Sequence, residues 1–373
     1  MKNLYVIVAL IIATGPPVKS QEHEETRREI EKIIFYDTEI DFSIQPGFIV
    51  GIVDYDSTII LGFGNTADNP SSIPEKSLLY ELGGLSKIFT AWLVRLLTME
   101  ELLSPDDPVN KHLPISHQNH LLDTIKLIHL ITHTSRLPKL PALMEYTASD
   151  SENRYAFFSK ESVLDSWAAL EAKDLSSISY LYSHFNYALL EIIIERVTSI
   201  PFEEALRNRI WTPLQMNRTT IHPDERELQY LAPGYDRAGR KTAPWKFDSF
   251  AGSEGIKSSP EDLCLFLSYV LNHPESQISQ AFYSLLQPHS HIPGTKKSYV
   301  AEAWHLFQNK SNYPIYLHSG RTSGHGSMIT FIPQTRTAVV ILSKSTHTLN
   351  GLGTLILRMI NYNWKRKYND QEN

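Results

Sequence analysis

The β-strand patterns of this sequence are confined to its two ends, and helical patterns fill the stretch between them. Near the N-terminus, Gly47–Val53 and Thr58–Gly64 are β-rich runs with Asp54–Ser57 between them, which predicts a hairpin. The C-terminal β-rich runs are Tyr313–His318, Ser327–Ile332 and Thr337–Leu342. This layout predicts an α/β protein whose sheet is assembled from both ends of the chain, with an all-α insertion beside it.

The middle of the chain has the periodicity of packed helices. The strongest pattern, Leu85–Leu102, repeats apolar residues at the spacing of one helix face. A helix beginning at Pro260 has Ser259 as its N-cap and acids in its first turn. Ile221–Gly252 is punctuated by proline, glycine and charge and predicts a long surface segment. Further helices are expected at Gln21–Phe35, Ile125–Thr132 (capped by Thr124), Ser166–Glu171, Asn186–Val197, Pro201–Ile210 and Leu352–Lys365.

These patterns divide the mature chain, residues 21–373, into two lobes. Residues 21–80 and 250–373 are expected to form an α/β lobe, and residues 81–249 a mostly helical lobe. A cleft between two such lobes is a common place for a small-molecule site.

Residues 1–20 have the layout of a secretory signal peptide. Lys2 precedes the apolar run Leu4–Ala13, and a polar stretch ends at Ser20. The apolar run is too short to span a bilayer, which takes about 20 residues. We therefore expect cleavage after Ser20 and a secreted or periplasmic protein without a transmembrane span. An uncleaved anchor is the alternative.

Charge and cysteine content exclude several classes of site and partner. The net charge of −6 argues against nucleic acid as a partner, because phosphate binding requires a basic face. The single cysteine, Cys264, excludes an internal disulfide and a cysteine zinc site and is expected to be a small core residue. His129 and His133 have ligand spacing on a helix, but packing and capping roles fit them better. We expect no cofactor and no metal.

Three segments carry groups that could do chemistry. Gly83-Gly84 opens a helix that holds Ser86 and Lys87, and a helix N-terminus suits an anionic group. Tyr182 and His184 stand two residues apart just before an apolar helix. The third segment, His318-Ser319-Gly320-Arg321, has glycine where a ligand could approach the backbone closely. Taken singly, each segment also fits a purely structural interpretation. Lys87 could be a surface lysine, Tyr182 and His184 could belong to a helix cap, and the third segment could be an ordinary hairpin loop.

In order and spacing, these segments resemble the three motifs of the serine β-lactamase and penicillin-binding protein superfamily, including class C β-lactamases, DD-peptidases and related esterases. The resemblance runs from about Pro46 to Leu342 and includes Asp106–Val109 and Pro213–Met216. It implies a β-lactamase/transpeptidase-like fold, with an antiparallel sheet flanked by helices. It also implies that Lys87 and Tyr182 stand where the relatives keep their shared base.

The first two motifs depart from the superfamily pattern. The first aligns as Gly84-Leu85-Ser86-Lys87, which puts glycine where the relatives have the nucleophilic serine. The second aligns as Tyr182-Ser183-His184, with histidine in place of an asparagine. The third is intact as His318-Ser319-Gly320, where the resemblance implies binding of a substrate carboxylate, and backbone N–H groups at 84 and 321 would form the oxyanion hole. In a supporting turn, Arg136 replaces a usual glycine.

The departures lead us to expect an exported pseudoenzyme that forms no acyl-enzyme and binds a carboxylate- or peptide-like ligand, possibly derived from the cell wall. Its ligand contacts would be Gly84, His318, Ser319, Gly320 and Arg321. Losing a nucleophile that acts as a unit with its base costs on the order of 10⁴–10⁶ in rate.

Two alternatives remain open at the level of sequence. The first is a repurposed, non-covalent enzyme that uses Lys87, Tyr182 or His184. The second is an active serine hydrolase of β-lactamase, DD-peptidase or esterase type with a displaced serine, for which Ser86 and Ser183 are candidates. Ser86 lies about 200° around the helix from Gly84 and should point away from the site.

Overall fold

The computed structural model describes residues 18–64, 77–147, 153, 155–177, 180–308, 313–347, 349 and 351–369. The apolar run of the predicted signal peptide, Leu4–Ala13, lies outside these residues. Contacts divide the chain into two units, Met1–Glu39 and Ile40–Asn373. The first unit contains helix α1 (Val18–Asp37), which covers the charged segment predicted to be helical. No helix among the described residues has the length and apolar character needed to cross a bilayer.

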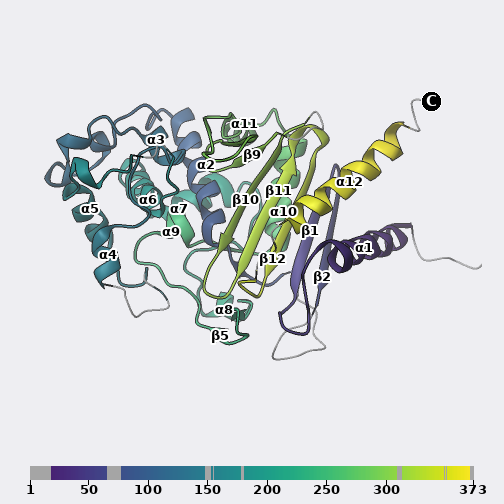
Figure 1. Ribbon diagram of the computed structural model, residues 1–373. Coiled ribbons are helices and arrows are strands. Elements are labelled where there is room, and N and C mark those ends of the chain that lie inside the picture. Colours follow the sequence, from purple (N-terminus) through teal and green to yellow (C-terminus); the bar gives the residue numbers. More distant parts are fainter. Residues whose placement is uncertain are drawn as a thin grey trace, which may run out of the picture. The chain divides into compact units, whose positions relative to one another are not determined.

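The second unit is built on an antiparallel sheet that joins the two ends of the chain (Figure 1). Strand β1 pairs on one side with β2 and on the other with β12, and Val50 faces Ile341 across that second pairing. The predicted α/β class and the sheet made from both ends are therefore confirmed. In spatial order the strands are β2 (Ser57–Phe63), β1 (Phe48–Asp54), β12 (Thr337–Ser343), β11 (Gly326–Ile332), β10 (Ile315–Arg321), β9 (His305–Phe307), β8 (Ser298–Val300) and β7 (Ser290–His291).

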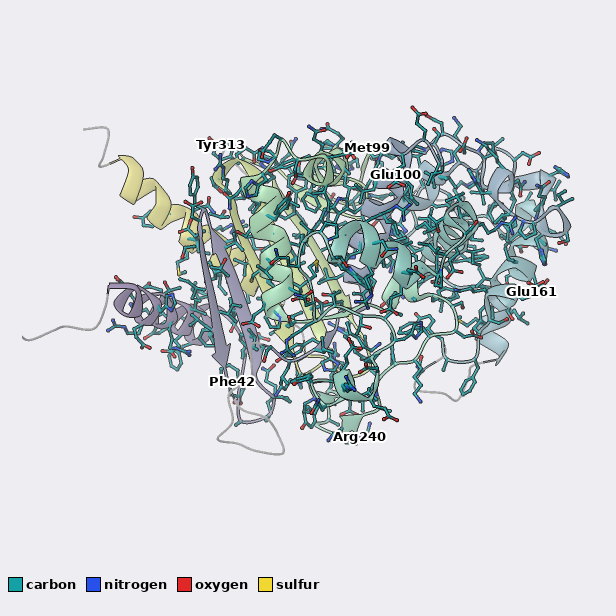
Figure 2. The ribbon with its side chains drawn as sticks, turned by 180° about the vertical axis from the view of Figure 1, so that it is seen from behind. Phe42, Met99, Glu100, Glu161, Arg240 and Tyr313 are labelled. Atoms are coloured by element: carbon teal, nitrogen blue, oxygen red, sulfur yellow. The ribbon has the colours of Figure 1, made fainter. Side chains whose placement is uncertain are left out.

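Helices cover both faces of this sheet. Helix α12 (Leu352–Asn369) lies in front of β11 and β12 in Figure 1, and Gly353 packs against Met328. Helix α10 (Pro260–Asn272) lies against β1 and β12 on the opposite face, which Figure 2 shows from behind. Cys264 of α10 is buried, as expected, and a Cβ on Gly51 would lie only 2.5 Å from its sulfur. Glycine in β1 thus allows the helix to approach the sheet closely.

The remaining helices lie mainly between β2 and β7 in the sequence. Helix α2 (Ser86–Met99) is almost entirely buried and packs against α6, α7, α9 and α11. The other α-helices are α3 (Leu127–Ile131), α4 (Ala142–Thr147), α5 (Lys160–Ala168), α6 (His184–Thr198), α7 (Phe202–Leu206), α8 (Glu225–Leu228), α9 (Ala251–Glu254) and α11 (Gln277–Ser284). Shorter elements are the 3₁₀ turns η1 (Gly83–Leu85), η2 (Val109–His112), η3 (Ile115–His117), η4 (His120–Leu122), η5 (Ala172–Asp174) and η7 (Pro333–Thr335), the π-helix η6 (Arg207–Trp211), and the pairs β3 (Tyr80–Glu81) with β6 (Lys257–Ser258) and β4 (Gly234–Tyr235) with β5 (Lys241–Thr242).

Several local predictions are confirmed. The hairpin of β1 and β2 turns at Tyr55-Asp56, inside the predicted connection. Ser259 caps α10, since its side chain accepts a hydrogen bond from the backbone of Asp262. A serine cap followed by proline in the first turn is a strong local signal, and tertiary packing does not override it here.

Other local predictions are wrong, and each error has a physical reason. Thr124 does not cap α3, because the chain first makes a turn in which Ile125 donates to Leu122 and the helix begins only after Lys126. The helix predicted at 166–171 instead spans Lys160–Ala168 and is capped by Ser159. The supposed surface segment 221–252 contains buried residues and the pair β4–β5, and α9 begins at its end. Strands β7 to β9 were not predicted, because two- and three-residue strands carry almost no periodic signal.

Candidate functional site

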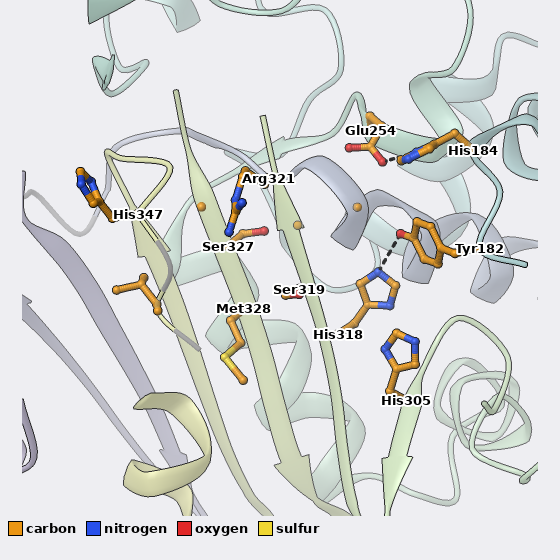
Figure 3. A pocket seen from close by; sticks show the side chains of 14 residues that line it. Tyr182, His184, Glu254, His305, His318, Ser319, Arg321, Ser327, Met328 and His347 are labelled. Atoms are coloured by element: carbon orange, nitrogen blue, oxygen red, sulfur yellow. Dashed lines mark hydrogen bonds and ion pairs between the residues drawn. The ribbon is translucent and has the colours of Figure 1, made fainter. Parts of the chain in front are cut away.

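A cavity of about 350 Å³ lies between the β10–β11 hairpin and residues of the helical segments (Figure 3). It brings together Gly84, Tyr182 and His184 with the third motif, so all three predicted segments meet there. Lys87 is the one predicted site residue that does not line it. The lining residues are Gly84, Tyr182, His184, Glu254, His305, His318, Ser319, Gly320, Arg321, Gly326, Ser327, Met328, His347 and Leu349.

Close backbone contact between β10 and η1 positions Gly84 at this cavity. Gly83 has a φ of +52°, and a Cβ there would lie 2.7 Å from the backbone nitrogen of Arg321. A Cβ on Gly320 would lie 2.0 Å from the carbonyl oxygen of Leu82 and 2.6 Å from the nitrogen of Gly84. Glycine is therefore required sterically at 320, and the third motif belongs to strand β10 itself rather than to the loop that the sequence predicted.

The space in front of Gly84 is small and polar. A Cβ built on Gly84 would lie 3.1 Å from the Tyr182 hydroxyl, 3.4 Å from His318 Nε2 and 3.0 Å from the carbonyl oxygen of Ser319. A side chain at position 84 would therefore project toward the tyrosine and the histidine of the second and third motifs. The contacts are tight by a few tenths of an ångström, so the site fits glycine more closely than serine.

Lys87 lies on α2 with its side chain fully buried behind the cavity. Its Nζ donates to Glu254 Oε1 at 2.8 Å and to the Ser253 carbonyl at 3.0 Å, and it lies 4.9 Å from the centre of the Tyr182 ring. Burial lowers the pKa of Lys87, and the neighbouring Glu254 carboxylate opposes that shift. The positive charge of Lys87 is thus compensated by Glu254 rather than presented to the cavity.

The carboxylate of Glu254 also contacts the imidazole of His184. Oε1 of Glu254 lies 2.6 Å from His184 Nδ1. Burial alone would raise the pKa of Glu254, but Lys87 and His184 outweigh it and bring that pKa to about 2. Burial lowers the pKa of His184, with Lys87 acting in the same direction and Glu254 against it. Glu254 is therefore a carboxylate and His184 a neutral imidazole near neutral pH.

Tyr182 and His318 face each other on the other side of the Gly84 space. The Tyr182 hydroxyl lies 3.5 Å from His318 Nε2, and His318 Nδ1 lies 2.6 Å from the carbonyl oxygen of Ala303. A carbonyl only accepts, so Nδ1 of His318 carries the proton and Nε2 accepts from the tyrosine. Burial brings the pKa of His318 to about 3 and raises the pKa of Tyr182 well above its usual 10. Both side chains are neutral hydrogen-bonding groups.

The two serines considered as displaced nucleophiles are engaged elsewhere. Ser86 Oγ accepts a hydrogen bond from the backbone of Ile256, which is consistent with its expected direction away from the site. Ser183 Oγ donates to the carbonyl of Pro138 and caps α6. Within the described residues, no serine Oγ is hydrogen-bonded to Lys87 Nζ or to the Tyr182 hydroxyl.

Arg136 occupies a left-handed backbone conformation, with a φ of +68°. This conformation strains residues that have a Cβ and favours glycine, which explains why the superfamily pattern has glycine in this turn. The backbone of Arg136 accepts from Ser176, and its guanidinium donates back to the Ser176 carbonyl. These contacts hold the substituted turn in place.

Glu254 is a charged site residue that the sequence prediction missed, and the cavity-lining His305 and His347 were missed as well. Glu254 ends the four-residue helix α9, directly after a segment predicted to lie on the surface. The only available signal was indirect: a lysine that is buried on a largely apolar helix requires a counter-charge. The sequence offers 41 acidic residues and no means of choosing among them.

The histidines considered as metal ligands have separate hydrogen-bonding roles. His129 Nδ1 accepts from the backbone of Lys126, and His133 Nδ1 accepts from the backbone of Ser183. The grouping that does place three possible ligand atoms together among the described residues is His117 with Glu161 and Asp165. Both acids are mostly exposed and each contacts the His117 imidazole, and none of the three lines the cavity.

Comparison with known families agrees with this geometry. The beta-lactamase family model matches residues 42–358, which includes the sheet, the helical segments and every residue of the cavity. The chain belongs to the beta-lactamase family. The superfamily resemblance and the β-lactamase/transpeptidase-like fold inferred from the motifs are therefore confirmed.

Curated relatives are distant members of this family. Protein flp of Staphylococcus aureus strain MW2 is 26% identical over 317 residues, covering 82% of this chain and 62% of the relative. Unguisins hydrolase ungD' of Aspergillus campestris is 25% identical over 361 residues, covering 88% of this chain and 66% of the relative. The chain thus spans about three fifths to two thirds of the length of these relatives.

Solved structures share the fold at lower identity. The octameric penicillin-binding protein homologue from Pyrococcus abyssi has a TM-score of 0.75 and 22% identity, covering 92% of this chain and 78% of its own. The beta-lactamase/D-alanine carboxypeptidase from Yersinia pestis, solved with citrate, has a TM-score of 0.76 and 18% identity, covering 92% and 99%. At 22% and 18% sequence identity, the structural similarity shows that these two proteins share the fold of this chain.

Proposed function

We propose that this beta-lactamase family protein is a pseudoenzyme with respect to acylation: its cleft binds a carboxylate-bearing, peptide-like ligand and forms no acyl-enzyme. The observation that carries the proposal is the surroundings of Gly84. The space where a nucleophile would project faces Tyr182 and His318, and among the described residues no serine hydroxyl is hydrogen-bonded to Lys87 Nζ or to the Tyr182 hydroxyl. A glycine has no group that could be acylated.

The carboxylate of the ligand would bind at the β10 side of the cleft. Arg321 lines the cavity there, and its guanidinium can form paired hydrogen bonds with a carboxylate. Backbone N–H groups at Gly84 and Arg321 are proposed as further donors. Lys87 is not part of this binding surface, because it lies behind the cavity and its charge is matched by Glu254. The cation that favours an anionic ligand is therefore Arg321 instead of Lys87.

The cellular location is part of the same proposal. Residues 1–20 act as a signal peptide, and cleavage after Ser20 delivers the protein to the periplasm or the exterior. A peptide-like ligand derived from the cell wall would be available there. The carboxypeptidase among the structural relatives is named for D-alanine, which makes a D-alanine peptide a suitable first probe.

The binding experiment compares two probes that differ only at the C-terminus. N-acetyl-D-alanyl-D-alanine, which has a free carboxylate, should bind in calorimetry at least about tenfold more tightly than its C-terminal amide, a difference of about 1.4 kcal/mol. Arg321→Gln should remove that preference. The matched control is Arg240→Gln, since the side chain of Arg240 is 80% exposed and pairs with Asp236 outside the cavity. Equal binding of acid and amide would refute the carboxylate site.

A further inference from the structure

Among the described residues, two polar atoms of cavity-lining side chains have no hydrogen-bond partner. Glu254 and His184 both line the cavity, with side chains only 4% and 12% exposed. Their mutual contact uses Oε1 of Glu254 and Nδ1 of His184. In the part of the chain that the structure describes, no hydrogen bond engages the other two atoms, Glu254 Oε2 and His184 Nε2. Neither atom is among the fully buried side-chain atoms without a partner, so both reach the cavity and can contact a group that enters it.

The contact with Glu254 fixes the proton on His184. Nδ1 of His184 lies 2.6 Å from Glu254 Oε1, 3.0 Å from Ser253 Oγ and 3.3 Å from Lys87 Nζ. The carboxylate is the nearest of the three and can only accept, so we place the proton on Nδ1, which leaves a lone pair on Nε2. The backbone holds this orientation, because His184 N donates to the carbonyl of Lys139 at 2.9 Å and Ser183 caps α6. A carboxylate behind an imidazole whose second nitrogen faces a cleft is the arrangement of a histidine general base.

Four other titratable side chains around the cavity are less suited to take a proton from water. Tyr182 keeps its proton, and His318 Nε2 faces the Tyr182 hydroxyl and has a pKa of about 3. His305 Nε2 lies 3.2 Å from the hydroxyl of Tyr180. Glu254 itself, with a pKa of about 2, accepts a proton only weakly. His184 differs from these four in that a carboxylate contacts one ring nitrogen while the other has no partner among the described residues.

We propose that the cleft hydrolyses an ester or amide bond of its carboxylate-bearing ligand directly with water, and that His184 Nε2 is the general base. This inference rests on the proposed function, because the scissile carbonyl must lie beside Gly84 when the ligand carboxylate is held at Arg321. Glu254 acts as a positioning residue through His184. The carbonyl and the attacking water would occupy the cavity of about 350 Å³ in front of Gly84, which has no group that could form a covalent intermediate.

The reaction balances without any other reagent. His184 Nε2 removes a proton from water while the water oxygen forms a bond to the carbonyl carbon, and the carbonyl π electrons move to its oxygen. The tetrahedral intermediate then re-forms the carbonyl and breaks the bond to the leaving oxygen, sulfur or nitrogen. The proton on Nε2 passes to that leaving group. One water is consumed, and the products are a carboxylic acid and an alcohol, thiol or amine.

The pH dependence follows from the charges that surround His184. Lys87 of α2, Glu254 of α9 and Lys139 in the segment before α4 act on the imidazole. Burial and the two lysines lower its pKa, while Glu254 raises it, and the result is a pKa below the usual 6.5. Since the neutral form is the base, turnover should be constant at neutral pH and fall as the pH drops below that pKa.

The test uses the thioester N-acetyl-D-alanyl-thioglycolate, which has a reactive carbonyl and a free carboxylate. Thiol release should be catalysed, and the protein quenched in acid during turnover should have its unmodified mass. His184→Gln should lower kcat by about 10²-fold or more, the usual contribution of a general base. His120→Gln is the matched control, because the side chain of His120 is 79% exposed and does not line the cavity, and this variant should leave kcat unchanged.

Glu254→Gln tests the positioning role of Glu254. This variant should lower kcat more than it changes KM, and it should shift the acid limb of the pH profile.

The outcomes separate this inference from the binding proposal. If N-acetyl-D-alanyl-D-alanine binds as proposed but the thioester is not turned over, direct hydrolysis is refuted and the binding role stands. The same holds if turnover survives His184→Gln in a variant that still binds the peptide. A covalent adduct on any serine would overturn both.

Discussion

Glu254 Oε1 lies 2.8 Å from Lys87 Nζ, and both side chains are buried. In a fully buried setting neither charge is tolerated alone, because the penalty for removing an ion from water is several kcal/mol. The pair therefore decides two properties of the protein together: the stability of the junction between α2 and α9, and the protonation state of the residue that the superfamily uses as a base.

A double-mutant cycle should show strong coupling in this pair. Lys87→Met leaves a buried carboxylate without its cation and should lower the free energy of unfolding by about 3–5 kcal/mol. Glu254→Gln should have an effect of similar size. The double variant Lys87→Met/Glu254→Gln should lose clearly less than the sum, because it leaves no unpaired charge. Urea unfolding of the four proteins measures this, and additive losses would show that the pair is not coupled.

Restoring the missing nucleophile should not by itself restore acylation. In Gly84→Ser, the ammonium of Lys87 stays bound to Glu254, so it cannot readily accept the serine proton. The carboxylate of Glu254 raises the pKa of Lys87, and removing that charge should free the amine to act as a base. We expect Gly84→Ser/Glu254→Gln to react with a fluorophosphonate at least about tenfold faster than Gly84→Ser, and the rate of mass increase measures this.

If the single variant Gly84→Ser is labelled as fast as the double variant, Glu254 does not restrain Lys87. Modest destabilisation of Gly84→Ser is expected in either case. The added Cβ would lie 3.0 Å from the carbonyl of Ser319, so the surrounding chain must move by a few tenths of an ångström.

Acid should destabilise the protein through Glu254. Its folded-state pKa of about 2 lies below the ordinary value of 4.5, so its contribution to stability is fully present above about pH 4.5 and is lost as the pH falls toward 2. Glu254→Gln should therefore lose less stability than the wild type between these two pH values. Denaturant unfolding at several pH values tests this, and parallel curves for the two proteins would contradict it.

Glu191 should have the opposite pH dependence. Burial raises the pKa of Glu191 to about 7, against the effects of Lys160 and of the backbone hydrogen bond from Gly252. The folded state binds this proton more tightly than the unfolded state does, so stability falls as the pH rises from about 4.5 through 7. Relative to the wild type, Glu191→Gln should gain up to about 3 kcal/mol between pH 4.5 and 8. Thermal unfolding across this range measures the gain, and a constant difference would refute it.

The fold could be predicted from sequence because its signals are local and repeated. A short stretch of sequence was enough to predict each of three elements: the hairpin of β1 and β2, the apolar face of α2 and the Ser259-Pro260 start of α10. The two-ended sheet followed from where the β-rich runs lie. Strands β7 to β9 could not be predicted, because a strand of two or three residues is too short to show the alternation of apolar and polar residues.

The site could be predicted only in part, and for a different reason. Gly84, Tyr182 and His318 stand in motifs whose order the sequence displays, and they meet at one cavity. Glu254 comes from a segment with no motif, about 70 residues beyond His184, and long-range pairing has no signature in a single sequence. Burial and Glu254 together set the charge state of Lys87. The position of Lys87 behind the cavity could therefore be seen only in the three-dimensional arrangement.

The most direct test of the account is the intact mass of the wild-type protein after exposure to reagents that acylate or phosphonylate serine hydrolases. We predict that neither a fluorophosphonate nor a β-lactam leaves an adduct, even at long exposure, whereas an active beta-lactamase family enzyme treated in parallel is modified. A stoichiometric mass increase that maps to a serine of the wild-type chain would contradict the central claim that acylation has been lost at Gly84.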